Sequence, residues 1–181
     1  MKKAIRIFLT VVGALTVLFV VYLLLTVDQR RAAYTAAIEQ DSAETYVTAT
    51  PDGILTLVNK KRGEAGAEPL IVGNELQASA QWKAEDMANR GYFSHEDPST
   101  NKNNGLDKAI ELTGSFCSNV SENLYEGTGA YVTSQSSVDW WMGSQSHKDA
   151  MLATKYTYTG IGVATDKNGK VYQVQHFCQK Q

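Results

Sequence analysis

The apolar residues near the start of the chain form one unbroken run. Residues 7–27 read IFLTVVGALTVLFVVYLLLTV, carry no charge, and follow three basic residues. A helix rises about 1.5 Å per residue, so this run is long enough to span a hydrocarbon core of about 30 Å. We expect residues 1–27 to form an uncleaved signal anchor, a single transmembrane helix. A cleaved signal peptide remains the alternative, because small residues follow at position 33 and at positions 35–37.

After this run the apolar pattern disappears, and it then returns at helical spacing. Residues 28–49 are rich in Ala, Thr, Gln and Glu, which predicts a juxtamembrane linker. Residues 50–181 form the predicted folded domain. Its first helix is expected to begin at Pro51, because proline suits the first helical position, and to end near residues 63–66.

A second apolar stripe predicts a longer helix that begins at Asn74 and ends at Gly91. The apolar positions recur about once per turn, at Leu76, Ala80, Ala84, Met87 and Ala88. Asn74 and Gln77 have the spacing of a capping box, which would satisfy free N–H groups at the helix start. Gly91 supplies a helix stop.

Shorter elements follow. Residues 106–112 predict a short helix, and residues 114–124 predict an extended segment. Two more helices are expected after Ser136 and Ser144, since serine can accept hydrogen bonds from the free N–H groups of a helix start. The second of these helices should run through Leu152.

The last part of the domain alternates small, branched and polar residues, as strands do. Residues 160–164 and 171–178 flank the tight-turn signal Asn168–Gly169, which predicts a β-hairpin. The two glycines of the first strand indicate close packing beneath a bulky neighbour, expected to be Trp140 or Trp141. Helices, an extended segment, further helices and a hairpin predict an α+β fold and exclude a repeating βαβ pattern.

Composition and charge narrow the location and the partners. The chain has 181 residues and a formal net charge of -2, which suits one globular domain and gives no basic surface for nucleic acid. More basic residues precede the apolar run than follow it, so we expect the folded domain to lie outside the cytoplasm. The membrane is then one of its partners, through the N-terminal helix. Cys117 and Cys178 fit this location, where two cysteines are expected to form a disulfide, although spacing alone does not prove it.

Three side chains on separate connections could carry chemistry: His95, Glu122 and His147. Two imidazoles and one carboxylate suit a divalent metal ion, usually zinc, and equally suit a general acid–base pair. His147 falls in the first turn of a predicted helix, where the helix N-terminus favours the neutral ring. The simpler alternatives are a surface histidine at 147 and a solvent-facing glutamate at 122. His176, in the last strand, is assigned a structural place and no role.

Five motifs occur here in an order that resembles the CAP superfamily, also called SCP-like (cysteine-rich secretory proteins, antigen 5 and pathogenesis-related 1). They are LVNKKRGEAGAEPL, LQASAQWKAEDMANRGYFSH, SENLYEG, WWMGSQSHKDAML and YTGIGVATDKNGKVYQVQHFC. The likeness covers residues 51–178 and is strongest to short bacterial members. It implies a three-layer α-β-α sandwich with a central antiparallel sheet and a cleft on one side.

The resemblance also implies a set of residues that lines the cleft. Longer members have two histidines and two acidic residues there, which can hold a metal ion. His95, Glu122 and His147 match three of these positions. Ser144 occupies the fourth corner, where longer members have a glutamate, and losing that carboxylate weakens the charge that holds a cation. Three ligands and a water would still make an open zinc site, and a polar cleft without tightly bound metal is the alternative.

These observations favour a binding module over an enzyme. No serine or cysteine lies in a recognised nucleophile motif, so no catalytic residue is assigned. We expect a membrane-anchored, extracytoplasmic domain whose His/Glu/His cleft takes a small hydrophobic or cell-envelope ligand or a partner. One alternative is a metal-assisted hydrolase, in which Glu122 acts as general base on a water held by His95 and His147. The other is an inert structural or adhesion domain.

Overall fold

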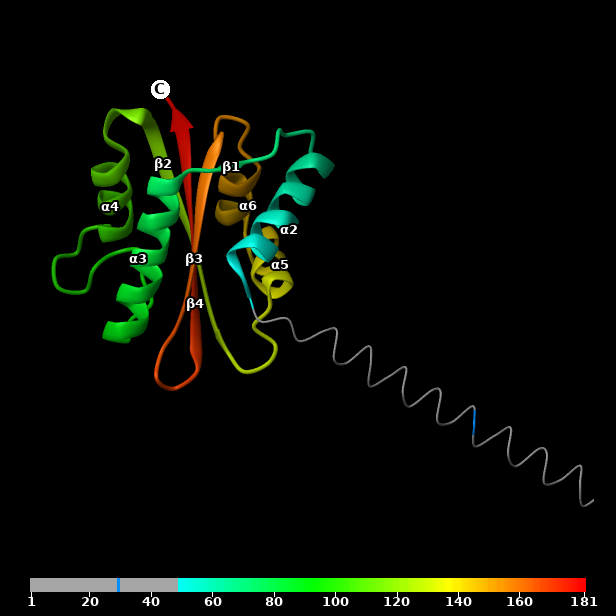
Figure 1. The fold of residues 1–181 in the computed structure, drawn as a ribbon, viewed down its shortest axis with the longest axis vertical. Helices are drawn as coiled ribbons and strands as arrows, with labels where there is room; N and C mark the ends of the chain where they lie inside the picture. The colour runs from blue at the N-terminus through cyan, green and yellow to red at the C-terminus, as the bar shows by residue number, and fades with distance from the viewer. Residues whose placement is uncertain (1–28, 30–48) are drawn as a thin grey trace, which may run out of the picture. The chain divides into compact units, whose positions relative to one another are not determined.

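The computed structural model describes residues 29 and 49–181, and residues 49–181 lie within one compact unit (Figure 1). The predicted signal anchor, residues 1–27, lies outside the described residues, as does the predicted linker apart from its positions 29 and 49. Within the part of the chain that the structure describes, no helix is both long and apolar enough to cross a membrane. The domain start at residue 50 stays a prediction.

The first described helix, α2, spans Pro51–Glu64 and begins where the sequence predicts. Thr50 caps it, because its hydroxyl accepts a hydrogen bond from the Gly53 N–H at 3.1 Å. Ile54 and Val58 lie one turn apart on the buried side of this helix. They fix the face of α2 that packs on the rest of the domain.

The long helix α3 spans Asn74–Arg90, but its start differs from the prediction. Gly73 is the N-cap, without a side-chain bond, and Asn74 is already helical, so the predicted capping box at Asn74 and Gln77 is wrong. The Gln77 amide instead reaches the main chain of Ile161 in the sheet. Gly91 ends the helix in the left-handed conformation (φ 68°), which confirms the predicted stop.

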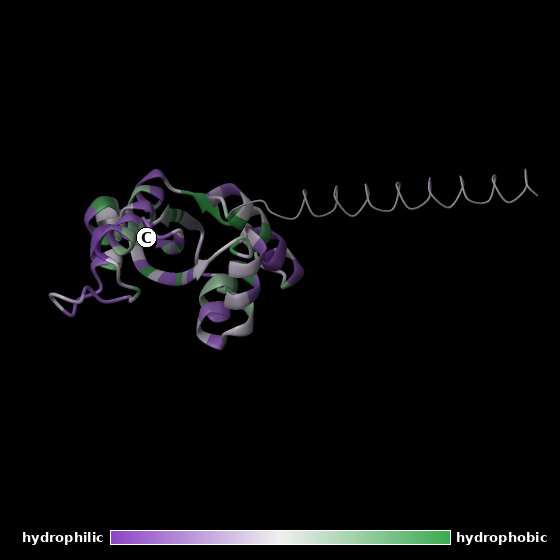
Figure 2. Ribbon diagram, turned by 90° about the horizontal axis from the view of Figure 1, so that it is seen from below, coloured by the Kyte–Doolittle hydropathy of each residue, from purple (hydrophilic) through white to green (hydrophobic). Residues whose placement is uncertain are grey.

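Four strands form one sheet in the order β1-β3-β4-β2. They are β1 (Ile71–Val72), β2 (Cys117–Thr128), β3 (Tyr158–Thr165) and β4 (Lys170–Lys180). β2, β3 and β4 are antiparallel, whereas the short, exposed β1, a hydrophobic arrow in Figure 2, runs parallel to β3. The sheet is therefore mixed, which corrects the expected antiparallel sheet. The connection from β1 to β3 contains several helices, so no tight turn forces the two strands to be antiparallel.

Helices cover both faces of this sheet, so the expected three layers are present (Figure 1). On one face lie α3 and α4 (Asn104–Thr113), and on the other lie α2, α5 (Ser134–Gly143) and α6 (Gln145–Leu152), while a short 3-10 turn, Gly114–Phe116, leads from α4 into β2. Each face has its own apolar core. The α3 core comprises Ala80, Ala84, Met87, Leu124, Tyr172 and Val174. The core on the other face includes Ile54, Val58, Val138, Trp141, Met151, Ile161 and Phe177.

The two glycines of β3 lie directly against the backbone of α3. A Cβ on Gly160 would lie 2.1 Å from the Leu76 carbonyl carbon, and one on Gly162 would lie 2.2 Å from the Ala80 oxygen. The predicted close packing is therefore present, but the expected tryptophan neighbour is wrong. Trp141 is buried in the core on the opposite face, because α5 covers that side of the sheet.

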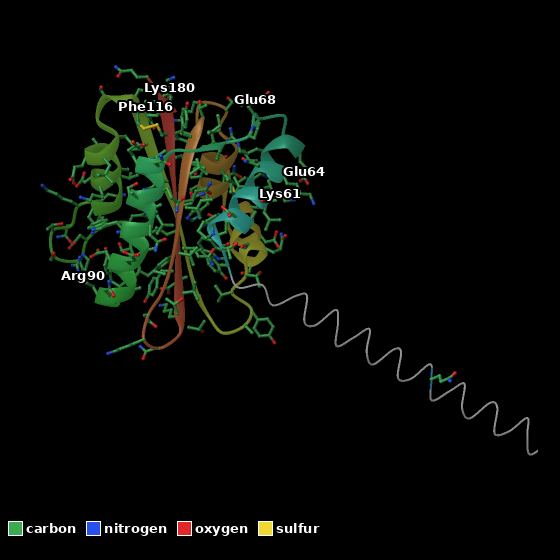
Figure 3. The ribbon with its side chains drawn as sticks, viewed as in Figure 1. Lys61, Glu64, Glu68, Arg90, Phe116 and Lys180 are labelled. Carbon is green, nitrogen blue, oxygen red and sulfur yellow. A yellow bond between two sulfur atoms is a disulfide. The ribbon has the colours of Figure 1, made fainter. Side chains whose placement is uncertain are left out.

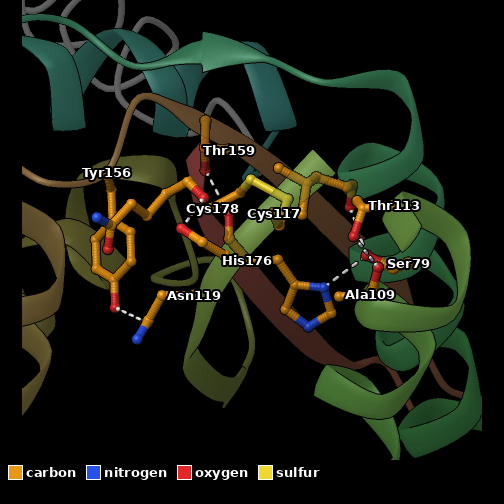
Figure 4. The surroundings of a disulfide bond; sticks show 12 residues. Ser79, Ala109, Thr113, Cys117, Asn119, Tyr156, Thr159, His176 and Cys178 are labelled. Atoms are coloured by element: carbon orange, nitrogen blue, oxygen red, sulfur yellow. Dashed lines mark hydrogen bonds between the residues drawn. A yellow bond between two sulfur atoms is a disulfide. The ribbon is translucent and has the colours of Figure 1, made fainter. Parts of the chain in front are cut away.

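Of the remaining local predictions, the hairpin and the disulfide are confirmed and the cap of α5 is wrong. The β3–β4 hairpin forms, with Gly169 at φ 80° in its turn. The cap of α5 is Thr133 rather than the predicted Ser136, which instead supplies the reciprocal bond of a capping box. The predicted disulfide between Cys117 and Cys178 is present, with the Cα atoms 5.5 Å apart, and joins the start of β2 to the end of β4 near Phe116 (Figures 3 and 4).

Candidate functional site

Glu122 lies near the middle of β2, and both of its carboxylate oxygens are hydrogen-bonded. His95 Nδ1 lies 2.7 Å from Oε1, and His176 Nε2 lies 2.9 Å from Oε2. Only 1% of the Glu122 side chain is exposed, so a partner is required for its charge. The solvent-facing alternative for this glutamate is therefore wrong, and the sheet itself presents the carboxylate to the loop that carries His95.

His176 is the member of this arrangement that the sequence interpretation missed. It is fully buried on β4 and stands opposite Glu122 in the β2–β4 register. Its Nδ1 lies 2.8 Å from the Ser79 hydroxyl on α3, as the dashed line in Figure 4 marks. His176 is buried, as its predicted structural role requires, and it also holds Glu122 in position through the hydrogen bond to Oε2. No motif surrounds it, so only the pairing of β2 with β4 identifies this partner.

The pKa of Glu122 results from opposed effects. Burial by itself would raise the pKa, but the hydrogen bonds from His176 and His95, together with the positive charges of His176 and Lys83, lower it to about 2. Glu122 is therefore ionised at neutral pH, and its oxygens already accept from two rings. Such a carboxylate is a weak base and serves best to orient His95.

A buried lysine holds the loop on which His95 lies. Lys83, on α3, is fully buried, and its ammonium donates to the His95 carbonyl at 3.2 Å and to Asn104 Oδ1 at 2.6 Å. It also donates to the Tyr92 hydroxyl at 3.2 Å. Burial lowers the pKa of Lys83, and the negative charge of Glu122 opposes that shift. The His95 loop is thus anchored at its main chain as well as at its ring.

His147 approaches from the other side of β2, in the first turn of α6. Ser144 occupies the N-cap position, as predicted, but its side chain makes no capping bond; its hydroxyl lies 2.8 Å from His147 Nδ1 instead. The His147 ring packs on Trp140, with the ring centroids 4.8 Å apart. Burial and the positive charge of His95 lower the pKa of His147, so the predicted neutral ring is retained, although for a reason other than the helix terminus.

A pocket of about 390 Å³ lies between the two histidines. Its lining combines apolar and polar side chains: Phe93, Ser94, His95, Glu96, Leu124, Trp140 and His147. Trp140 is 48% exposed and Phe93 is 38% exposed, so large apolar surface remains accessible at the pocket. Glu122 lies behind His95 and is not part of the lining. The structure therefore brings His95 and His147 to one pocket and pairs Glu122 with His95, but not with His147.

The predicted metal site can be tested against these contacts. Glu122 has both oxygens engaged by histidines, and one nitrogen of His147 is engaged by Ser144. Among residues 29 and 49–181, no group of three or more His, Cys, Asp or Glu side chains is arranged to hold a metal ion. The arrangement does not fit a three-ligand site of His95, Glu122 and His147, and zinc binding stays a prediction.

Comparison with known proteins agrees with this fold. A model of the CAP family, described as the cysteine-rich secretory protein family, matches residues 55–177. The uncharacterized protein YkwD of Bacillus subtilis (strain 168) is 28% identical over 134 residues, which are 74% of this chain and 49% of that protein. The uncharacterized membrane protein YlbC of the same strain is 26% identical over 144 residues, 80% of this chain and 38% of that protein. The chain thus spans half or less of both relatives.

Two solved structures share the architecture. An extracellular protein containing a SCP domain from Bacillus anthracis superimposes with a TM-score of 0.61 at 21% identity, over 72% of this chain and 40% of that one. An outer surface protein from Borrelia burgdorferi gives a TM-score of 0.61 at 18% identity, over 71% of this chain and 90% of that one. At these identities the likeness shows the fold alone.

Proposed function

The chain belongs to the cysteine-rich secretory protein (CAP) family, and from this premise we propose that it is a membrane-anchored extracytoplasmic binding domain. Its cleft takes a small hydrophobic or cell-envelope ligand or partner. The apolar run at 7–27 supports the anchor, and the Cys117–Cys178 disulfide suits an oxidising compartment. The names of the similar proteins, which include an extracellular, an outer surface and a membrane protein, agree with this location.

The pocket between His95 and His147 carries this proposal. Ligand pockets are mostly apolar, with a few polar groups that fix the orientation of the ligand. Phe93, Leu124 and Trp140 supply the apolar lining, and the two imidazoles supply polar groups at its sides. Each ring is held by a partner, Glu122 or Ser144, so the polar groups are already oriented in the protein.

The alternative of a hydrolase has less support. A general base works best with a pKa near the working pH, whereas the pKa of Glu122 is about 2. Both of its oxygens accept hydrogen bonds from histidines and only 1% of its side chain is exposed, so a substrate water has little access to the carboxylate. We therefore retain the binding role as the proposed function.

The test compares two exposed tryptophans. Octanoate and soluble peptidoglycan fragments would be titrated into the full chain in lipid nanodiscs, with empty nanodiscs as blank. Trp140→Ala removes pocket lining, whereas Trp82→Ala removes a tryptophan of similar exposure (37%) that lies on α3 under Lys108. We expect at least tenfold weaker binding in the first variant and less than twofold change in the second. No binding, or equal loss in both variants, would contradict the proposal.

A further inference from the structure

One edge of the sheet is closed by side chains of α3. The main chain of β3 points away from β4 at its odd-numbered residues, and near its start these groups pair with β1. Beyond β1, the Gln77 amide bonds both the N–H and the C=O of Ile161, at 3.1 and 2.6 Å. The Gln81 amide does the same for Val163, at 3.1 Å for both bonds. Two glutamines thus replace the missing part of a neighbouring strand.

The same alternation fixes which groups point outward at the opposite edge, on β2. In an antiparallel pair, each residue directs both main-chain groups either toward its partner strand or away from it. The main-chain groups of the odd-numbered residues of β3 face outward, so those of its even-numbered residues bond even-numbered residues of β4. The odd-numbered residues of β4 are then left to bond β2, and their partners in the register are the odd-numbered residues of β2. The main-chain N–H and C=O groups of Val120, Glu122 and Leu124 therefore point away from β4. The Trp141 indole independently agrees, because it donates to the Leu124 carbonyl at 2.9 Å.

This second edge is open beside the pocket. Glu122 as a whole residue is 7% exposed although its side chain is only 1% exposed, so its accessible surface is mainly main chain. Beyond the sheet, no hydrogen-bond partner is found among the described residues for the main-chain groups of Val120 and Glu122. Leu124 lies two residues further along β2 and lines the pocket. The open edge and the pocket are therefore contiguous.

We propose that this edge recognises an extended peptide segment, which adds to β2 as a further strand. The peptide main chain bonds the outward groups of Val120 and Glu122, and one apolar side chain enters the pocket beside Leu124. A strand advances about 3.3 Å per residue and alternates its side chains, so one peptide can meet the edge and the pocket together. This inference rests on the proposed function and names the ligand class of its cleft.

The chemistry of the edge favours a peptide over a hydrocarbon chain. A fatty chain would cover the main-chain groups of Val120 and Glu122 without bonding them, and covering unpaired N–H and C=O groups is costly. An added strand bonds the same groups in a regular pattern. The walls also suit a narrow, extended ligand, because the Glu122 carboxylate meets His95 on one face of β2 and Asn123 bonds the His147 carbonyl on the other.

The main test changes the peptide and leaves the protein intact. The probe is a capped peptide of alternating Thr and Val with a central Phe and a Lys at each end, titrated into the full chain in nanodiscs. Single N-methyl groups are then placed at successive peptide bonds. We expect at least tenfold weaker binding at every second bond and less than twofold change at the bonds between. Equal effects at all bonds, or none at any, would overturn the inference.

A substitution in the protein tests the same edge. Val120→Pro removes an outward N–H that takes no part in the β2–β4 ladder, a position at which edge strands tolerate proline. Val120→Ala is the matched control. We expect at least tenfold weaker peptide binding in the proline variant, and less than twofold change in the alanine variant, at similar unfolding temperatures. Retained binding in a folded Val120→Pro chain sinks the proposal, and if this variant does not fold, the N-methyl series decides.

The outcomes separate this inference from the proposed function. Peptide binding that is lost in Trp140→Ala but indifferent to N-methylation overturns strand addition and leaves the cleft as a binding site. Failure of every peptide probe, with octanoate or peptidoglycan fragments still bound, does the same. Failure of all probes overturns both proposals.

Discussion

The outward main-chain groups are covered at one edge of the sheet and uncovered at the other. Along β3, the edge not paired by β1 is covered by Gln77 and Gln81, which bond every outward group that they reach. Along β2, the outward main chain near Glu122 has no such cover among the described residues, and it borders the pocket. Unpaired strand edges invite association with other chains, so proteins usually protect them.

The difference shows that the open edge is not a general feature of this domain. The same helix, α3, supplies both the glutamines that close the β3 edge and Ser79 and Lys83, which hold the groups around Glu122. One element therefore protects one edge and organises the site at the other. This division of roles makes the β2 edge the place to look for a ligand.

The largest expected effect is the loss of stability when the contact between α3 and the β3 edge is disrupted. Gly160→Ala places a Cβ 2.1 Å from the backbone of α3, so the helix must move off the sheet and its glutamines lose their register. We expect a loss of about 4 kcal/mol in the free energy of unfolding, or no folded protein. Gly143→Ala is the control, because a Cβ there has no atom within 4 Å. Urea unfolding compares them, and equal stability of the two variants would disprove the close approach.

The next effect is at the open edge, where Glu122→Gln weakens the pairing with His95 and His176. A pKa lowered from 4.5 to about 2 corresponds to about 3 kcal/mol of stability at neutral pH. Because the folded pKa lies below the unfolded one, this stability is present above about pH 5 and is lost as the pH falls toward 2. We therefore expect the wild type to exceed the variant by about 3 kcal/mol at pH 7, with the gap shrinking below pH 4.5.

A glutamate on the same strand provides the control for this result. Glu126 lies on β2, pairs with Lys170 of β4 and is partly exposed. Glu126→Gln should cost less than about 1 kcal/mol, because ion pairs close to the surface generally contribute little to stability. Unfolding is measured between about pH 3 and pH 7 for both variants. A pH-independent difference for Glu122→Gln would show that its charge does not stabilise the fold.

A smaller effect is expected when both glutamines that cover the β3 edge are removed, which leaves this edge uncovered as well. In the double variant Gln77→Ala and Gln81→Ala, the outward groups of Ile161 and Val163 lose their bonds, which should cost about 2 kcal/mol. The uncovered edge should also promote concentration-dependent association, detectable by light scattering. Gln145→Ala, which removes only an exposed bond to Asp149, should change neither quantity. A monomeric double variant of unchanged stability would argue that water replaces the amides fully.

Features that depend on neighbouring residues could be predicted from the sequence. The start of α2 at Pro51 and the stop at Gly91 depend on local hydrogen bonds, and the structure has both where expected. Ser144 occupies the predicted N-cap position of α6, although its side chain makes no capping bond. Gln77 shows where local reasoning fails: its spacing suits a capping box, but its amide gains two bonds to a buried strand instead. The tertiary partner outweighs the local one.

His176 could not be found because it depends on register. Counting inward from the disulfide would pair Glu122 with Gln173, but Cys117 stands opposite Lys180 rather than opposite Cys178. An irregularity between Cys117 and Asn119 then shifts the register by one further residue, which places His176 opposite Glu122. Local sequence does not specify such a shift. The same limit applies to Gly160, which indicated close packing but not which helix would approach.

The smallest expected effect tests whether His95 and His147 face one another across the open edge. Burial, and then the positive charge of His95, lowers the pKa of His147. His95→Gln removes that charge, so the pKa of His147 should rise part of the way toward its ordinary value of 6.5 while burial still holds it low. Lys148→Gln removes a charge that has no such influence and should leave the titration unchanged. Imidazole NMR signals followed against pH give both values. If His147 titrates identically in wild type and His95→Gln, the two rings act independently, and a ligand that spans the β2 edge need not sense both.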